Sequence, residues 1–227
     1  ECYKNLICVT HLLTKNLSKM IKNIAAFLLL CIFISCKEEG RKLPYYDTAD
    51  YTPKWEMKDK NSFHAIRKFN LVDHEGKAFT EKDLDGKITV ADFFFTICPG
   101  ICPKMAVSME GIQTEFLNDK DVQLISHSVM PGKDSVPVLK AYATEKNVQY
   151  NKWKLLTGEK SEIYDLGRKY YYVEEDLGVN SDTSIFLHTE NFVLIDKNRH
   201  IRGIYNSLDN NSMAALVNDI KALKKED

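Results

Sequence analysis

An apolar run meets a pair of cysteines in the segment Ile88-Thr89-Val90-Ala91-Asp92-Phe93-Phe94-Phe95-Thr96-Ile97-Cys98-Pro99-Gly100-Ile101-Cys102-Pro103. Residues 88–95 are apolar apart from Thr89 and Asp92, which is typical of a central strand covered on both faces. Beyond the cysteines, apolar residues recur at helical spacing: Met105, Met109, Ile112 and Phe116. Cys98 and Cys102 are therefore predicted where a buried strand ends and a helix begins, and Pro103 suits the first helical turn because its missing N–H needs no partner there.

Strands and helices alternate along the rest of the chain. A hairpin of residues 69–72 and 78–80 comes first, and a hairpin of residues 191–196 and 201–205 comes near the end. Between them the pattern predicts strands at 122–129 and 153–156, a helix at 136–146 and a helix marked by Ile163, Leu166 and Tyr170. A final amphipathic helix carries Met213, Leu216, Ile220 and Leu223. This order predicts an α/β domain with a thioredoxin-like fold, a central mixed sheet with helices on both faces, and an added N-terminal hairpin.

The charge balance excludes one class of partner. The chain has 31 basic and 32 acidic residues and a net charge of -1. Proteins that bind nucleic acid usually carry a basic excess, so we expect no nucleic-acid partner.

The N-terminal region resembles a bacterial lipoprotein signal. Lys19 and Lys22 precede an apolar run, residues 24–34, that has the length of a signal-peptide core and is too short to span a bilayer. The run ends at Ser35-Cys36, and in such signals the cysteine is lipidated and becomes the mature N-terminus. Phe33 stands where Leu is usual, and a buried core helix is the alternative. We predict a signal region at 1–36 with cleavage before Cys36, and residues 1–19 fit an over-extended gene start ahead of Met20.

The predicted cleavage before Cys36 decides which cysteines the mature protein retains. Cys2, Cys8 and Cys31 fall in the removed part, so only Cys98 and Cys102 remain free in the mature body. Residues 37–61 are charged, contain Tyr and Pro and lack a clear period, which predicts a polar tether ahead of a domain at 62–227. One close cysteine pair does not make a disulfide scaffold, so we expect the pair to serve chemistry.

The C-x-x-x-C pair favours metal or redox chemistry. A helix N-terminus stabilises thiolate over thiol. Two thiolates can bind Cu(I) or zinc, or be oxidised to a disulfide. The spacing is one residue wider than the C-x-x-C of ordinary dithiol oxidoreductases. A purely structural disulfide is the alternative, although its loop is too short for much entropic gain.

The sequence resembles the Sco/SenC family of copper chaperones. Residues 95–103 resemble the family signature F-T-x-C-P-x-x-C-P, and agreement continues through 83–87, 134–143 and 155–158 and at His188 ahead of 192–196. The resemblance implies that Cys98, Cys102 and His188 bind copper. It also implies a metallochaperone, with or without thiol–disulfide reductase activity, that serves the dinuclear copper site of cytochrome c oxidase or another thiol or copper acceptor. Together with Cys36 it places the protein in the bacterial cell envelope, lipid-anchored to the membrane and facing the periplasm.

The residues themselves support His188 less strongly. It precedes a strand at the place where thioredoxin-like oxidoreductases carry a cis-proline, and no proline follows Pro137. An imidazole there suits copper in either oxidation state. Two alternatives stay open: a thiol–disulfide oxidoreductase or peroxide-reducing enzyme without metal, and a copper or redox sensor.

Two nearby residues have both a packing and a functional interpretation. His127 lies in a predicted strand close to the cysteines, where it either packs or supports a ligand. Met130 replaces the Asp that the family usually has in Ser-(Ile/Val)-Asp-Pro. Its thioether is either a packing group or a soft auxiliary contact that favours Cu(I).

Overall fold

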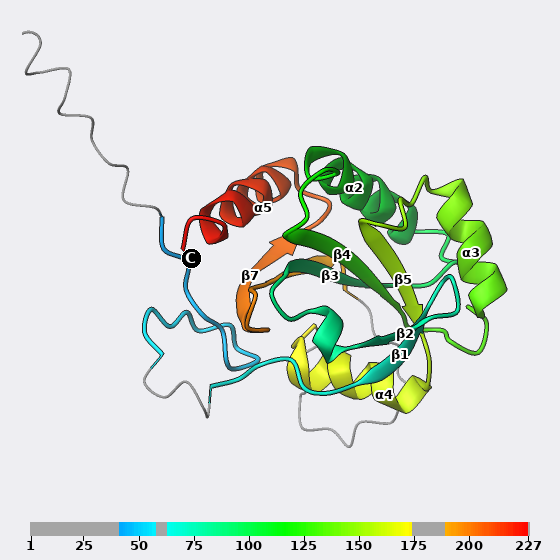
Figure 1. Ribbon diagram of the computed structural model, residues 1–227, viewed down its shortest axis with the longest axis horizontal. Coiled ribbons are helices and arrows are strands. Elements are labelled where there is room, and N and C mark those ends of the chain that lie inside the picture. Colours follow the sequence, from blue (N-terminus) through cyan, green and yellow to red (C-terminus); the bar gives the residue numbers. More distant parts are fainter. Residues whose placement is uncertain (1–40, 58–62, 174–188, 227) are drawn as a thin grey trace, which may run out of the picture. The chain divides into compact units, whose positions relative to one another are not determined.

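A mixed β-sheet forms the centre of the domain. The structure, a computed structural model, describes residues 41–57, 63–173 and 189–226, which belong to one compact unit, Gly40–Asp227. In this part of the chain the sheet has seven strands in the order β2-β1-β5-β4-β3-β6-β7 (Figure 1). Their bounds are β1 Asn70–Asp73, β2 Ala78–Thr80, β3 Ile88–Phe94, β4 Val122–Ser128, β5 Trp153–Thr157, β6 Asn191–Ile195 and β7 Ile201–Asn206. Strands β3, β4 and β5 are parallel and the other pairs are antiparallel, so the predicted mixed sheet is confirmed.

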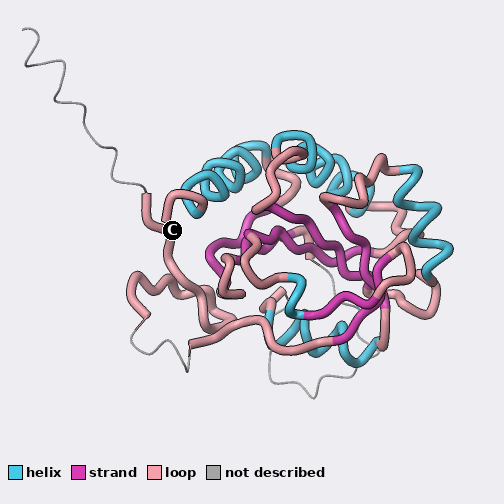
Figure 2. The backbone as a smooth tube through the Cα atoms, viewed as in Figure 1, coloured by secondary structure: helices cyan, strands magenta, loops and turns pink. Residues whose placement is uncertain are grey.

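Helices cover both faces of this sheet, as predicted (Figures 1 and 2). Three of them, α2 Cys102–Glu115, α3 Val136–Glu145 and α5 Asn210–Leu223, share one face. The other face carries α4 Lys160–Asp165, which continues as a π-helical turn, η2 Leu166–Tyr170. A short 3₁₀ turn, η1 Glu81–Asp83, links β2 to β3. The predicted N-terminal hairpin is β1–β2, and it joins the sheet through β5.

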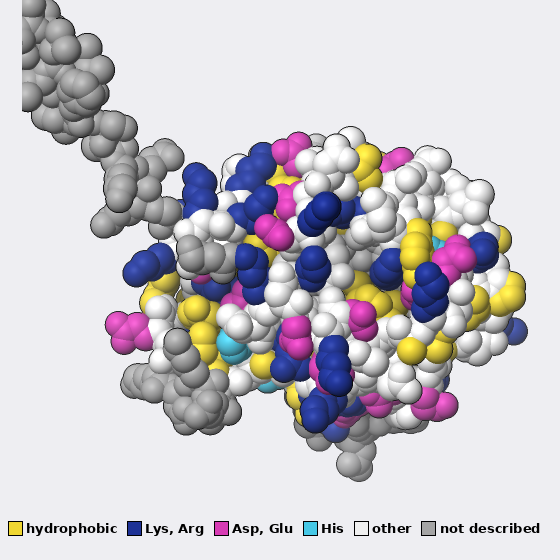
Figure 3. Space-filling view, viewed as in Figure 1, with side chains coloured by type: hydrophobic (Ala, Val, Ile, Leu, Met, Phe, Trp, Pro, Cys, Tyr) yellow, Lys and Arg dark blue, Asp and Glu magenta, His cyan; other side chains and the backbone are white. Residues whose placement is uncertain are grey.

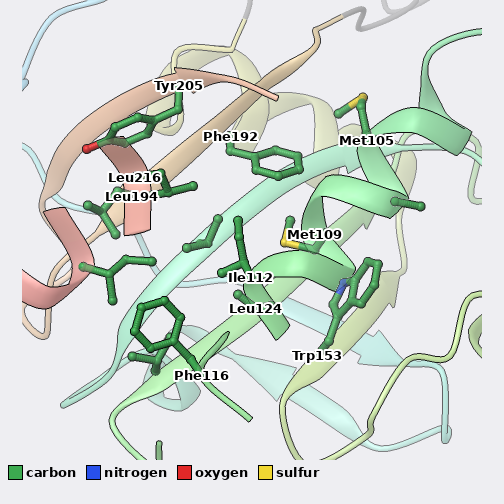
Figure 4. Close-up of a cluster of buried hydrophobic side chains, with 14 of the residues drawn as sticks. Met105, Met109, Ile112, Phe116, Leu124, Trp153, Phe192, Leu194, Tyr205 and Leu216 are labelled. Carbon is green, nitrogen blue, oxygen red and sulfur yellow. The ribbon is translucent and has the colours of Figure 1, made fainter. Parts of the chain in front are cut away.

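The two cores follow from the period of two in the central strands. Val90 and Phe94 of β3 pack with α2, α3 and α5, whereas Ala91 and Phe93 pack on the opposite face. Figure 4 shows part of the first core, with Met109 of α2, Leu124 of β4 and Trp153 of β5 gathered between helix and sheet. Asp92 has the same parity as Val90 and Phe94, so it lies on the face that α2 covers.

The described part of the predicted tether packs on the domain. We call residues 41–57 the N-terminal strap. Leu43 is buried and its N–H donates to Glu226 Oε1 at 2.8 Å, while Arg202 donates to the carbonyls of Leu43 and Pro44 at 2.7 and 3.0 Å. Tyr46 forms a backbone bridge with Ile201 of β7. Residues 41–57 of the predicted tether are therefore held on the domain, because burial of Leu43 and backbone pairing outweigh their polar composition.

The signal region and Cys36 lie outside the described residues. Within the described ranges, no helix has the length and apolar character needed to cross a membrane. Lys and Arg side chains are interspersed with Asp and Glu on the face shown in Figure 3, as the balanced composition leads one to expect.

Candidate dithiol site

The cysteine pair lies at the carboxyl end of β3, at the start of α2. Cys98 is half-buried in the loop between them, and Cys102 is the first residue of α2 and is 5% exposed. Both are free thiols in the structure. Pro103 follows in the first turn, as predicted. Next to the pair, Ile97 is 62% exposed, so an apolar side chain stands in solvent directly beside Cys98.

Backbone N–H groups converge on the Cys98 sulfur. Burial alone raises the pKa of this thiol, but hydrogen bonds outweigh burial and bring the pKa below its ordinary value. The donors are the Cys102 N–H, the Cys102 thiol and the N–H groups of Gly100 and Ile101. Such N–H groups at a helix N-terminus stabilise an anion, so the site favours the thiolate form of Cys98 more than solvent would.

Cys102 is shifted in the opposite direction. Burial, its hydrogen bond to Cys98 and the charges of Cys98 and Asp92 raise its pKa to about 12, although the Phe95 N–H lowers it. The site thus pairs a thiol whose pKa is lowered with a thiol whose pKa is raised. This asymmetry was not predicted from the sequence, which treated the two cysteines alike.

Asp92 is a buried carboxyl on the same face of the sheet as Cys102. Desolvation raises its pKa to about 7, although Ser126 donates a hydrogen bond to it. Its Oδ1 atom is buried without a hydrogen-bond partner. The sequence showed only that a polar residue interrupts an apolar strand, and that interruption was the available signal.

His127 lies on the opposite face of the sheet from Asp92. Its ring stacks on Phe93 at 4.9 Å, and its Nε2 lies 3.3 Å from the Tyr171 hydroxyl. Burial lowers its pKa to about 3, so the ring is neutral. The packing interpretation of His127 therefore fits, because its neighbours belong to the second core.

A second carboxylate, Asp134, was missed as a site residue by the sequence reasoning. It is fully buried and accepts hydrogen bonds from Thr96, two residues before Cys98, and from Ser128 at the end of β4. Met130 is half-buried in the turn between Ser128 and Asp134, and its carbonyl accepts the N–H groups of Lys133 and Asp134. The structure thus brings the Met130 turn and the segment before Cys98 together through Asp134.

His188 lies outside the described residues, in the stretch before β6. Among the residues that are described, no group of three or more His, Cys, Asp or Glu side chains is arranged to hold a metal ion. That part of the chain also contains no cis peptide bond.

The fold and the cysteine pair define a thioredoxin-like dithiol protein. The chain belongs to the SCO1/SenC family, whose model matches residues 57–225. The expected family resemblance is thereby confirmed.

Relatives support this assignment over different lengths. The "SCO1 protein homolog" of Bacillus subtilis is 26% identical over 206 residues, which is 90% of this chain and 97% of that protein. "Protein SCO1 homolog 1, mitochondrial" of Arabidopsis thaliana is 36% identical over 129 residues, 53% of this chain and 37% of its own length.

Solved structures agree on the fold. A SCO1/SenC family lipoprotein from Bacillus anthracis has a TM-score of 0.62 at 31% identity, covering 71% of this chain and 95% of its own. BsSco, described as a member of the Sco family of cytochrome c oxidase assembly proteins with a disulfide switch, has a TM-score of 0.62 at 26% identity, covering 72% and 95%. Copper is bound in the structure of Arabidopsis thaliana ScoI, with a TM-score of 0.55 at 27% identity, covering 71% and 99%.

Proposed function

We propose that this protein carries one copper ion on Cys98, Cys102 and His188, and that it delivers the ion to the copper site of cytochrome c oxidase or reduces a disulfide formed by the cysteines of that site. The observation that carries the proposal is the pair of unlike thiols on a Sco fold. Cys98 is stabilised as a thiolate and Cys102 is kept protonated beside it. Copper-bound relatives support copper as the cargo.

The described residues account for two of the three proposed ligands. Thiolates are soft donors that suit Cu(I), and an imidazole extends the set to Cu(II). Because a ligand must be deprotonated, Cys102 has to lose its proton when the ion binds. Met130 carries a soft sulfur in the neighbouring turn, and its part in Cu(I) binding remains a proposal.

The same asymmetry supports thiol–disulfide exchange. The Cys98 thiolate attacks one sulfur of an acceptor disulfide and displaces the other as a thiolate. Cys102 then loses its proton, attacks the Cys98 sulfur and releases the second acceptor thiolate. Two electrons pass from the cysteine pair to the acceptor, which is left as a dithiol. In this form the protein cannot bind copper until its own disulfide is reduced.

The location proposed for this chemistry is the outer face of a bacterial membrane. Lipidation at Cys36 would hold the domain there, and the lipoprotein from Bacillus anthracis is a related protein with that kind of anchor. The acceptor is a copper-site subunit of the oxidase, as befits a family whose member BsSco is called an oxidase assembly protein.

Metal content separates this function from a metal-free oxidoreductase. The reduced protein should bind about one copper per chain. Loss of copper in Cys98→Ser and Cys102→Ser, and loss of Cu(II) in His188→Ala, with correct folding by circular dichroism, would support the three-ligand site. A reduced protein that reduces disulfides but takes up no copper would establish the oxidoreductase instead.

A further inference from the structure

A carboxylate without a cationic partner lies between the ends of the two central strands. Asp134 Oδ1 accepts the Thr96 hydroxyl at 2.5 Å, and Oδ2 accepts the Thr96 N–H at 3.3 Å and the Ser128 hydroxyl at 2.5 Å. Its side chain is fully buried, and no ion pair within the described ranges includes it. Three donors thus replace the water that this carboxylate loses on burial.

These hydrogen bonds fix the backbone from which the cysteine loop departs. Thr96 follows Phe95, whose N–H donates to the Cys102 sulfur and whose carbonyl accepts the Cys98 N–H at 3.3 Å. Asp134 holds Thr96 by both its hydroxyl and its N–H. Phe95 therefore contacts both cysteines, and the next residue, Thr96, is held by the buried Asp134 carboxylate.

The clamp is anchored on the neighbouring strand. The Ser128 hydroxyl donates to Asp134 and accepts the Met130 N–H at 3.1 Å. The Val129 N–H donates to the Phe94 carbonyl at 2.8 Å, so the ends of β3 and β4 are also joined through their backbones. Movement of the segment before Cys98 would have to break several of these bonds together.

We propose that Asp134 is a positioning residue for the cysteine pair, acting through Thr96 to hold Phe95, which contacts both cysteines, and with it the backbone N–H groups of the loop at Cys98. The inference rests on the proposed function only in that the cysteine pair is the working site. Its effect is measured on the disulfide itself, without metal. Failure of copper binding would therefore leave this inference intact. An unchanged redox equilibrium in the Asp134 variant would likewise leave the proposed copper binding intact.

The sign of the effect separates positioning from simple electrostatics. A stabilised thiolate favours the reduced form of a cysteine pair. If Asp134 acts by position, Asp134→Asn loosens the N–H groups and shifts the equilibrium toward the disulfide. If it acted only through its negative charge, removing that charge would favour the thiolate and shift the equilibrium toward the dithiol.

The test is the equilibrium of the intact protein with a glutathione redox buffer. We expect Asp134→Asn to shift the equilibrium about tenfold toward the disulfide, which corresponds to about 30 mV. Thr96→Val keeps the carboxylate and removes the hydroxyl, and should shift the equilibrium in the same direction. It also serves as the test should Asp134→Asn not fold.

Asp73→Asn is the matched control. Asp73 is a buried carboxylate that accepts the Tyr150 hydroxyl at 2.7 Å and two backbone N–H groups, but it lies on β1, which β5 and β4 separate from β3. A shift toward the dithiol in Asp134→Asn would overturn the proposal, as would a shift no larger than that of Asp73→Asn. An unchanged equilibrium in Thr96→Val would overturn the route through Thr96.

Discussion

The Cys102 thiol donates a hydrogen bond to the Cys98 sulfur, and the pKa values of the two thiols move apart. The pKa of Cys98 falls below its ordinary value, whereas that of Cys102 rises to about 12. The two residues are four positions apart, yet one belongs to a half-open loop and the other to the buried first turn of a helix. The two thiols of the pair therefore lie in different environments, and in the proposed exchange Cys98 attacks first and Cys102 follows.

Alkylation should reveal this difference. At pH 7 a thiol with a pKa of about 12 is ionised to only about one part in 10⁵, so Cys102 should react far more slowly than Cys98 with iodoacetamide. Peptide mass spectrometry of the reduced protein would measure both rates. Cys102→Ala should slow the reaction of Cys98, because it removes a hydrogen-bond donor that lowers the pKa of that thiol. Equal rates for the two cysteines in the native protein would contradict the assignment.

Copper uptake should depend on the redox state of the pair. Both sulfurs are required as thiolates, and a disulfide removes them as ligands. The reduced protein should take up about one equivalent of copper and the oxidised protein little. Titration followed by metal analysis after gel filtration would show this. Equal uptake by the two forms would place the metal elsewhere.

His188→Ala should separate the two oxidation states of copper. Two thiolates suffice for Cu(I), which accepts low coordination numbers, whereas Cu(II) prefers a set that includes nitrogen or oxygen donors. The variant should keep a cysteine pair that still cycles and some Cu(I), and lose most Cu(II) with its thiolate charge-transfer absorption.

A second histidine provides the control for that variant. His74 lies in the turn that follows β1 and accepts the Leu155 N–H through Nδ1, and β5 and β4 separate β1 from β3 in the sheet. The variant His74→Asn keeps an acceptor at this position. It should retain the Cu(II) absorption. Retention of that absorption by His188→Ala as well would make His188 a bystander and favour the metal-free oxidoreductase.

Asp92→Asn should change how stability depends on pH. The folded-state pKa of Asp92 is about 7 against 3.8 for the exposed group, so the protonated form is the one that folding favours. Its contribution is fully present below pH 4 and is lost as the pH rises through 7, by roughly 4 kcal/mol in total. The variant should resemble the native protein at pH 4 and exceed its free energy of unfolding at pH 8. Urea denaturation at both values measures the difference, and an equal difference at the two pH values would refute this account of Asp92.

Lipidation should begin the mature chain at Cys36. The apolar run that ends in Ser35-Cys36 motivates this expectation. Mass spectrometry of membrane-extracted protein should find an N-terminal Cys36 that carries acyl chains, and Cys36→Ser should release the protein from the membrane fraction. A mature protein that retains Met20 and carries no lipid would rule out the anchor.

The sequence predicted the fold because the spacing of apolar residues is clear in the central strand and the helix that follows it. Apolar residues at 88–95 required a strand buried on both faces, and the three- and four-residue spacing of Met105, Met109, Ile112 and Phe116 required a helix packed on it. The position of the cysteines at this junction followed directly. Composition was a poorer guide at the N-terminal strap, where backbone pairing of Tyr46 with Ile201 holds a polar stretch on the sheet.

The environment of the cysteines was not predictable in the same way. Asp92 and Asp134 are separated by 42 positions in the chain and affect the site from two different strand ends, so no local spacing connects them to Cys98 or Cys102. Their importance depends on burial and on hydrogen bonds from distant residues, which only the packed structure supplies. The pKa difference between the cysteines is likewise a property of the folded loop.

The N-terminal strap also covers part of the exposed edge of the sheet at β7. Strand β7 is the last in the order, and the Tyr46 N–H donates to the outward-facing Ile201 carbonyl at 3.0 Å. A shortened protein that starts at residue 57, where the family match begins, would leave that carbonyl without this partner. It would also deprive Arg202, which is 4% exposed, of the carbonyls of Leu43 and Pro44. An exposed sheet edge of this kind is a template on which a second chain can add a strand, so the N-terminal strap also guards the domain against self-association.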